Sequence, residues 1–273
     1  MAVFHGVNSN CGQNQAWVDM IAEGIDYQAV VRCVEIGDGR VTSVFERMEW
    51  QIKTGCWHLR NDPDFAGKRI SIVGISQGGL ISRSIVEQCE GLDVHTLFTY
   101  GGPHQGVSAY EMCHHKWCWP VNFVAGYLVQ YTLVQHWGAP TDYFRTWWNL
   151  DRYYAHSIFL PYVNNEEAPT LKYKERLTSL ANFGMFMWDS DSVVHPKESE
   201  WFGAYDANRH VVMLKDSTLY TEDTIGLKTL DEAGKLFFYH GSGDHMHLVP
   251  EYINSYLIPL LLDQTPAPSQ YYS

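Results

Sequence analysis

The stretch IVGISQGGL, residues 72–80, places Ser76 between glycines directly behind an apolar run. Residues 74–78 match the pattern G-x-S-x-G. In a tight turn from a strand to a helix, the central serine is held in a strained conformation, and side chains two residues away would collide. Glycine removes these collisions. The stretch therefore predicts a strand, a sharp turn that presents a serine hydroxyl, and a helix.

The segments on either side fit this interpretation. Residues 69–73 form a short apolar run, as expected of a buried strand. After the turn, Ile81, Ile85 and Cys89 recur every four residues, which predicts one face of a helix that ends near Gly91. The context favours a nucleophile over an ordinary turn serine.

The fold class follows from similar apolar runs elsewhere. Such runs, separated by helix-compatible segments, predict an α/β fold with a mostly parallel sheet and helices on both faces. The chain has 273 residues, long enough to bury a core without a metal or disulfide. The expected strands are residues 2–5, 69–73, 95–100, 182–188 and 235–240.

Residues 107–180 interrupt this alternation. They hold five of the ten tryptophans and many other aromatic residues. A structureless loop of this length is improbable, so we expect a helical cap insertion between two parts of the core, residues 1–106 and 181–273. The aromatic residues either fill a small core of the cap or line an apolar cleft, the usual lining of a small-molecule site.

The composition argues against several classes of function. The net charge is −12 and no basic run occurs, which argues against nucleic acid as a partner. No stretch of about 20 apolar residues is present, so no transmembrane helix is expected. Residues 2–6 already read as a strand and its exit turn, which leaves no room for a targeting segment. The chain is therefore either cytosolic or trimmed.

The six cysteines allow 15 pairings, and their even number weakly favours an oxidising compartment. Cys113 and Cys118 flank two histidines, which resembles half of a zinc site. Structural zinc needs four ligands of compatible spacing, and no second pair balances this one. A local Cys113–Cys118 disulfide is the favoured interpretation, and neither a metal nor another cofactor is expected.

A serine nucleophile needs a base, normally a histidine oriented by a carboxylate, and in α/β-hydrolases the order along the chain is serine, acid, histidine. The acid is expected on the turn after residues 182–188. We favour Asp191 over Asp189, because the Asp-x-Val-Val turn would swing its carboxylate back over the sheet. The expected base is His245, in the glycine-rich loop after residues 236–240, with His247 as the alternative.

The developing oxyanion needs two preorganised donors. One is expected to be the backbone N–H of Gln77, the residue after the nucleophile. The second usually comes from the loop after an early strand, where Gly6 allows a close approach. The backbone N–H of Val7 is the natural donor there.

Several longer stretches add a resemblance. They are "HG" at residues 5–6, "SQGGL" at 76–80, "GGPHQGV" at 101–107, "DSVVHPKESEWFGAYDAN" at 191–208, "LYTEDTIGLKTLDEAGKL" at 219–236 and "GDHMHL" at 243–248. In this order, over nearly the whole chain, they resemble the palmitoyl-protein thioesterases. The likeness is strongest outside the expected cap.

The resemblance implies an α/β-hydrolase with a helical insertion that helps to form a fatty-acyl groove. By position, it implies Ser76 as nucleophile, Asp191 as acid and His245 as base, with Val7 and Gln77 as oxyanion donors. It also implies the disulfides Cys56–Cys89 and Cys113–Cys118, and leaves Cys11–Cys33 as a third pair. Members of the family act on fatty-acylated proteins or acyl thioesters, in lysosomes or after secretion.

We therefore expect a serine hydrolase that cleaves long-chain fatty acyl thioesters, of the palmitoyl-cysteine or palmitoyl-CoA type, through an acyl-serine intermediate. A thiol leaves far more easily than an amine or an alkoxide. Because the histidine must be neutral to act as base, activity should fall on the acid side. The alternatives are a lipase or carboxylesterase that uses the same residues, and a non-catalytic lipid-binding relative.

Overall fold

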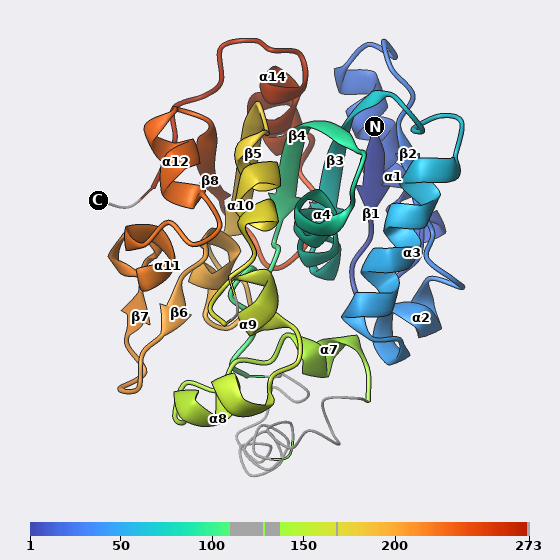
Figure 1. The fold of residues 1–273 in the computed structure, drawn as a ribbon. Coiled ribbons are helices and arrows are strands. Elements are labelled where there is room, and N and C mark those ends of the chain that lie inside the picture. The colour runs from blue at the N-terminus through green and yellow to red at the C-terminus, as the bar shows by residue number, and fades with distance from the viewer. Residues whose placement is uncertain (110–127, 129–136, 168, 272–273) are drawn as a thin grey trace.

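The computed structural model describes residues 1–109, 128, 137–167 and 169–271. Six strands form one sheet in the order β2-β1-β3-β4-β5-β8, and every neighbouring pair is parallel (Figure 1). This confirms the predicted α/β class. The strands are β1 (Ala2–Phe4), β2 (Arg32–Cys33), β3 (Arg69–Ile75), β4 (Asp93–Tyr100), β5 (Asn182–Trp188) and β8 (Leu236–Gly241).

The apolar strands have two buried faces. Consecutive strand residues point to opposite sides of a sheet, and here they enter two separate hydrophobic clusters. Ile72 belongs to one cluster and Val73 to the other; Leu97 and Phe98 are divided in the same way. Continuous apolar runs are therefore needed, because both sides of the sheet are covered.

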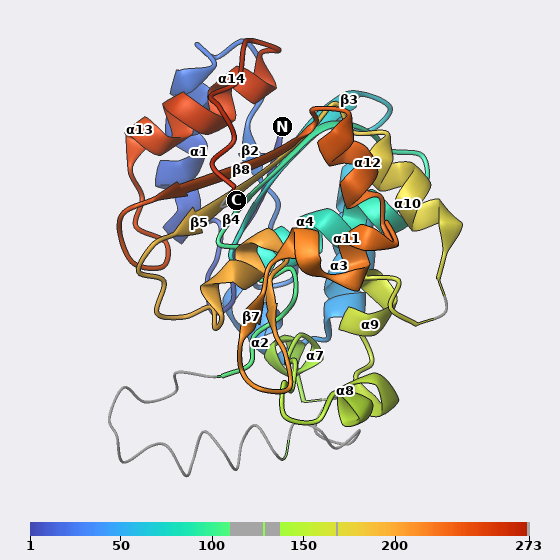
Figure 2. The ribbon, with the colours of Figure 1, turned by 90° about the vertical axis from the view of Figure 1, so that its left-hand side faces the viewer.

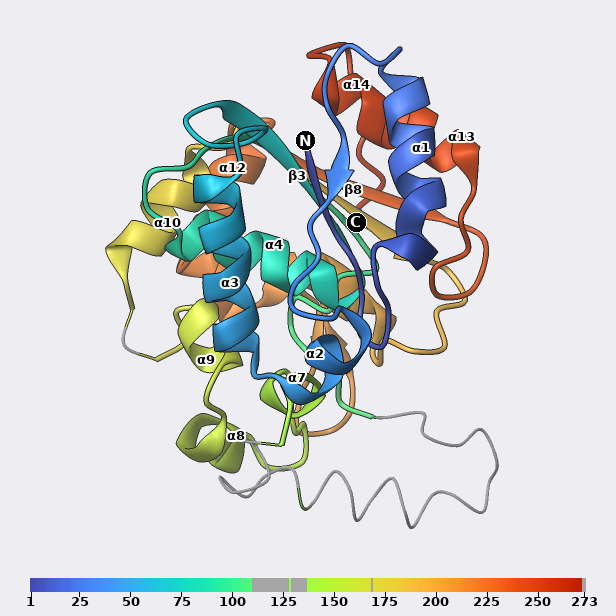
Figure 3. The ribbon, with the colours of Figure 1, turned by 90° about the vertical axis from the view of Figure 1, so that its right-hand side faces the viewer.

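Helices cover both faces, as predicted (Figures 2 and 3). On one face lie α1 (Gln15–Gly24) and a C-terminal segment made of α13 (Pro250–Tyr252), the π turn η5 (Ile253–Leu257) and α14 (Ile258–Leu261). On the other lie α3 (Met48–Asn61), α4 (Gln77–Gln88), α10 (Leu171–Thr178) and α12 (Leu227–Glu232).

Smaller elements complete the described chain. Beyond the carboxyl ends of the strands lie α2 (Arg40–Phe45), α7 (Ala139–Asp142), α8 (Leu150–His156) and α9 (Leu160–Val163) (Figure 1). Strands β6 (Ala204–Tyr205) and β7 (Val211–Val212) form an antiparallel pair. The rest are α11 (Thr218–Thr221) and the short helical turns η1 (Gly12–Asn14), η3 (Lys197–Trp201) and η4 (Leu214–Asp216).

The described part of residues 107–180 is fastened to the core. Val107 pairs with Phe144 in a parallel bridge, and Arg83 of α4 donates a 2.9 Å hydrogen bond to Oδ1 of Asn164. Tyr153 and Phe159 belong to the same hydrophobic cluster as the buried face of α4. In the described part of residues 107–180, the buried aromatic residues extend the main core and do not form a separate one.

Two of the three expected disulfides are present. Cys56–Cys89 joins α3 to the end of α4, and Cys11–Cys33 joins the loop after β1 to strand β2. The Cys113–Cys118 pair lies outside the described residues. Among the helices that the structure describes, none has the length and apolar character needed to cross a membrane.

Candidate active site

Ser76 lies on the predicted sharp turn between β3 and α4, with φ 54° and ψ −125°. The glycines around Ser76 are required because a Cβ at these positions would clash with neighbouring backbone atoms. A Cβ at Gly78 would lie 2.2 Å from the carbonyl oxygen of Phe4, and a Cβ at Gly74 would lie 2.4 Å from that of Gly78. Larger residues would force the strand and helix apart, and the turn would no longer hold the hydroxyl in place.

Three side chains far apart in the sequence meet at this turn. Nε2 of His245 lies 2.9 Å from Oγ of Ser76. Its other ring nitrogen, Nδ1, lies 2.5 Å from Oδ2 of Asp191. A proton can thus pass from the hydroxyl to the imidazole while the carboxylate holds the ring, which is how a serine hydroxyl becomes a nucleophile.

The environment of Asp191 keeps it ionised. Its Oδ1 accepts hydrogen bonds of 2.8 Å from the backbone N–H groups of both Val193 and Val194. Burial alone would raise the pKa of Asp191, but the hydrogen bond and charge of His245, with smaller contributions from other hydrogen bonds, hold it below its ordinary value. The carboxylate is therefore both charged and fixed by its own turn.

Asp189, the alternative acid, and His247, the alternative base, have other contacts. Oδ1 of Asp189 lies 2.8 Å from Nδ1 of His240 on β8. The backbone carbonyl of His247 accepts a 3.3 Å hydrogen bond from the indole of Trp188. In this structure the favoured residues of each pair, Asp191 and His245, are the ones that meet at Ser76.

The expected oxyanion donors lie on two elements beside the serine. Gln77 is the first residue of α4, and the first N–H groups of a helix have no acceptor within the helix. Its side chain is anchored, since Nε2 donates to the Ser43 carbonyl at 2.8 Å and Oε1 accepts from the Tyr143 hydroxyl at 3.0 Å. Val7 lies on the loop after β1.

A cavity of about 630 Å³ opens at the serine, and Val7, Ser76 and His245 all line it. Trp17, Ile75 and Leu248 are among its apolar walls, while polar side chains such as Asn8 and Gln13 lie on the loop side. Within the described residues, none of the lining comes from the expected cap. Much of that cap, residues 110–127 and 129–136, lies outside the described chain.

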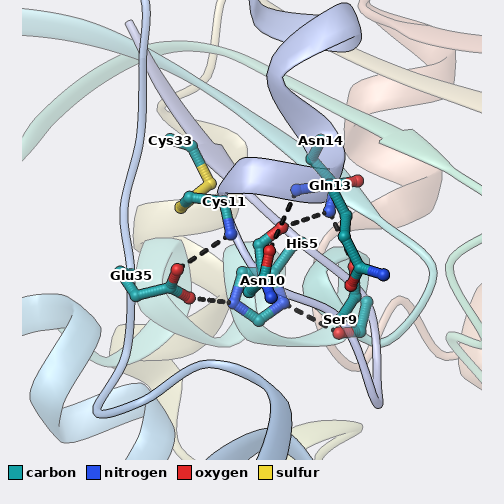
Figure 4. Close-up of a disulfide and its surroundings, with 9 residues drawn as sticks. His5, Ser9, Asn10, Cys11, Gln13, Asn14, Cys33 and Glu35 are labelled. Atoms are coloured by element: carbon teal, nitrogen blue, oxygen red, sulfur yellow. Dashed lines mark hydrogen bonds and ion pairs between the residues drawn. A yellow bond between two sulfur atoms is a disulfide. The ribbon is translucent and has the colours of Figure 1, made fainter.

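The loop that carries Val7 is held by an acidic side chain and a disulfide (Figure 4). Oε2 of Glu35 accepts a 2.8 Å hydrogen bond from the backbone N–H of Cys11, and Oε1 lies 2.7 Å from Nε2 of His5. Nδ1 of His5 lies 2.8 Å from the Gly6 carbonyl. One carboxylate thus ties both ends of the loop together.

Sequence reasoning missed several side chains around the site. Glu35 and Tyr143 carried no pattern that distinguishes them from ordinary surface or core residues, whereas Asp244 lies within the GDHMHL stretch of the family resemblance. Glu200 lies within the SEWFGAYD stretch that contributed to the family resemblance, so that stretch was a signal without an assigned role.

Several known proteins are similar in sequence to this chain. The sequence model of the family described as palmitoyl protein thioesterase matches residues 1–245. The chain belongs to this family. It is 32% identical over 260 residues to palmitoyl-protein thioesterase 3 of Dictyostelium discoideum, covering 94% of this chain and 88% of that protein. It is 32% identical over 207 residues to palmitoyl-protein thioesterase 1 of Caenorhabditis elegans, covering 71% and 66%.

A further relative agrees with this membership. Over 169 residues the chain is 30% identical to the lysosomal thioesterase PPT2 homolog of Drosophila melanogaster, covering 61% of this chain and 58% of that one. The crystal structure of Bacillus licheniformis lipase BlEst2 in its propeptide form superimposes with a TM-score of 0.50 at 14% identity, covering 100% of this chain and 52% of that chain. At that identity the likeness shows the shared fold alone.

Proposed function

We propose that this family member hydrolyses long-chain fatty acyl thioesters through an acyl-serine intermediate. The observation that carries the proposal is the continuous set of contacts from Ser76 through His245 to Asp191 beside a cavity. Membership of a thioesterase family supports the choice of bond. The substrate is a fatty-acylated protein or peptide, or a free acyl thioester.

In the first half-reaction, Oγ of Ser76 attacks the thioester carbonyl and its proton passes to Nε2 of His245. The N–H groups of Val7 and Gln77 stabilise the negative charge that develops on the carbonyl oxygen. When the carbon–sulfur bond breaks, the imidazolium returns the proton to the sulfur, and the thiol leaves. The acyl group remains on Ser76.

In the second half-reaction, His245 takes a proton from water, which attacks the acyl-serine carbonyl. The same two N–H groups stabilise the second oxyanion. The bond to Oγ then breaks, the imidazolium returns its proton to Ser76, and the fatty acid is released. Asp191 stays ionised throughout and keeps the imidazole in the correct orientation.

Two alternatives use the same residues and are separated by experiment. A lipase or carboxylesterase would cleave an oxygen ester at least as fast as a thioester of equal chain length, whereas the proposal expects the thioester to be faster. A non-catalytic lipid-binding relative would not react with a fluorophosphonate probe. We expect the probe to label the wild type and not Ser76→Ala, and thiol release to be lost in that variant.

The division into core residues 1–106 and 181–273 and a cap at 107–180 is part of the proposal. α7, α8 and α9 lie beyond the carboxyl ends of the strands, where a cap over the acyl chain would be placed (Figure 1). We also propose a lysosomal or secreted location, with the cytoplasm less favoured. The two disulfides and the lysosomal thioesterase relatives support it.

A further inference from the structure

Glu200 is a completely buried acid at the edge of the site. It lies in η3, and none of its surface is exposed. Among the described residues, no donor meets either carboxyl oxygen in good hydrogen-bonding geometry, and the backbone N–H of Trp188 is the one donor near enough to lower the pKa of Glu200. The charges that act on it most are both negative, those of Asp191 and the neighbouring Glu198. Buried acids normally have a cation or several donors around them, whereas in the described part of the chain Glu200 has only the poorly aligned N–H of Trp188.

Its nearest functional neighbour is the acid of the proposed triad. One polar side-chain atom from each of Glu200, Asp191 and His245 lies within 4.8 Å of the others, and the two carboxyl groups lie close enough to share a hydrogen bond. Two carboxylates have only acceptor oxygens, so that bond exists only when one of them carries a proton.

The proton belongs on Glu200. Asp191 already accepts two backbone N–H groups and faces the imidazole, and these contacts favour its ionised form. Burial raises the pKa of Glu200 well above its usual range, and the negative charge of Asp191 raises it further. Both environments therefore favour a protonated Glu200 and an ionised Asp191.

We propose that Glu200 is a positioning residue, a neutral carboxylic acid that donates a hydrogen bond to the ionised Asp191. This inference rests on the proposed function, because it assigns a role through the acid of that mechanism. The carboxylate of Asp191 then has a fourth donor, besides the Val193 and Val194 amides and the Nδ1–H group of His245. The imidazole of His245 faces one negative charge and not two.

The number of negative charges matters for the base. A second ionised carboxylate beside Asp191 would stabilise the imidazolium form of His245 and keep a proton on the base at higher pH. With Glu200 neutral, Asp191 is the one ionised carboxylate beside the imidazole in the described structure. The charged groups that face Glu200 are Asp191, Glu198 and His245.

Three variants separate this role from simple packing. Glu200→Gln stays neutral and keeps a donor, so kcat should remain within about threefold of the wild type. Glu200→Leu is neutral without a donor, so kcat should fall about ten- to a hundredfold with little change in KM, the usual loss for one hydrogen bond to a charged group. Glu198→Gln removes a charge from the same segment and should leave kcat unchanged.

The acid side of the pH profile gives the decisive kinetic readout. Glu200→Gln should lose activity at the same pH as the wild type, because no charge has been removed. If Glu200 is ionised in the wild type, the substitution removes a negative charge beside His245, and the acid side shifts to lower pH. That shift, or equal kcat values for Glu200→Leu and the wild type, would overturn the proposal.

A spectroscopic test does not depend on activity or on the folding of Glu200→Leu. Infrared difference spectra of wild type minus Glu200→Gln are recorded in the Ser76→Ala background. The pH is set above 7, because burial raises the pKa of two further buried acids, Glu87 and Asp142, to about 7. The carbonyl stretch of a protonated carboxyl should be present and should vanish with Glu200→Gln. Its absence refutes the neutral Glu200, whereas retained thiol release by Ser76→Ala refutes the proposed function instead.

Discussion

Asp244 fastens the loop of the proposed base to the loop of the proposed acid through Ser192. Its carboxylate accepts a 2.9 Å hydrogen bond from the backbone N–H of Ser192 and a 3.0 Å hydrogen bond from the Ser192 hydroxyl. It also accepts a 2.6 Å bond from the N–H of His245. One exposed side chain thus fixes the separation of the imidazole and the Asp191 carboxylate.

Removing this contact should loosen the site more than the fold. In Asp244→Ala we expect kcat for thioester hydrolysis to fall about thirtyfold, because the two hydrogen bonds that join the loops through Ser192 are lost at about 1 kcal/mol each, while the melting temperature changes little. Asp93→Ala is the control, because Asp93 is an exposed acid at the amino end of β4, far along the strand from the site. Equal kcat values for the two variants would mean that the two loops keep their positions without the Asp244 side chain.

The two neighbouring aspartates should differ sharply. Asp191→Asn removes the carboxylate that faces His245, and kcat should fall about a thousandfold or more. Asp189→Asn changes a contact with His240 instead, so kcat should stay within a few fold. Steady-state kinetics with one thioester substrate decide this, and a larger loss in Asp189→Asn would reverse the assignment of the acid.

The two described disulfides should also have different effects. Replacing either pair with alanine should cost about 3 kcal/mol of unfolding free energy, since the linked cysteines are 22 and 33 residues apart. Only the Cys11/Cys33 double variant should also lower kcat, because that disulfide and Glu35 hold the loop that carries Val7. Activity is measured at a temperature where both variants remain folded. An equal loss of kcat in the Cys56/Cys89 variant would contradict this.

Stability should fall between acidic and neutral pH through Glu87. Burial raises the pKa of Glu87 to about 7, although the charge and hydrogen bond of Arg83 oppose the shift. A carboxyl whose pKa is higher in the folded chain contributes fully below its unfolded value, 4.5 here, and its contribution is lost as the pH rises through its folded value.

Thermal unfolding between about pH 5 and pH 8 measures this effect. The decrease in melting temperature with rising pH should be smaller in Glu87→Gln than in the wild type. Glu90→Gln is the control. Glu90 is exposed, and its hydrogen bonds to Lys172 and Arg176 lower its pKa, so this variant should keep the wild-type slope. Identical slopes in all three proteins would show that Glu87 titrates normally.

Steric and periodic signals in the sequence were reliable. The glycines around Ser76 predicted the turn because no other residue fits there, and apolar runs predicted β1, β3, β4, β5 and β8. Strand β2 was missed because its two residues, Arg32 and Cys33, are polar or half-buried and too few to show a period. Local chemistry was therefore enough to locate the strands that carry the site.

Other features depend on tertiary contacts that no local pattern records. Asp189 and Asp191 lie on one turn, and the backbone N–H groups of Val193 and Val194 decide which carboxylate faces the imidazole. The buried aromatic residues of 137–167 join the cluster of α4, a placement that their composition did not distinguish from a separate core. Glu200 is buried against the general preference of glutamate for the surface.

The central claim is that Ser76 carries the acyl group. Its most direct test is rapid quenching of the enzyme with a palmitoyl thioester, followed by mass measurement of the peptide that contains residue 76. We predict a palmitoyl adduct on that peptide in the wild type and none in Ser76→Ala, which should also release no thiol. Continued thiol release by Ser76→Ala, or an adduct on any other residue during turnover, would contradict the account.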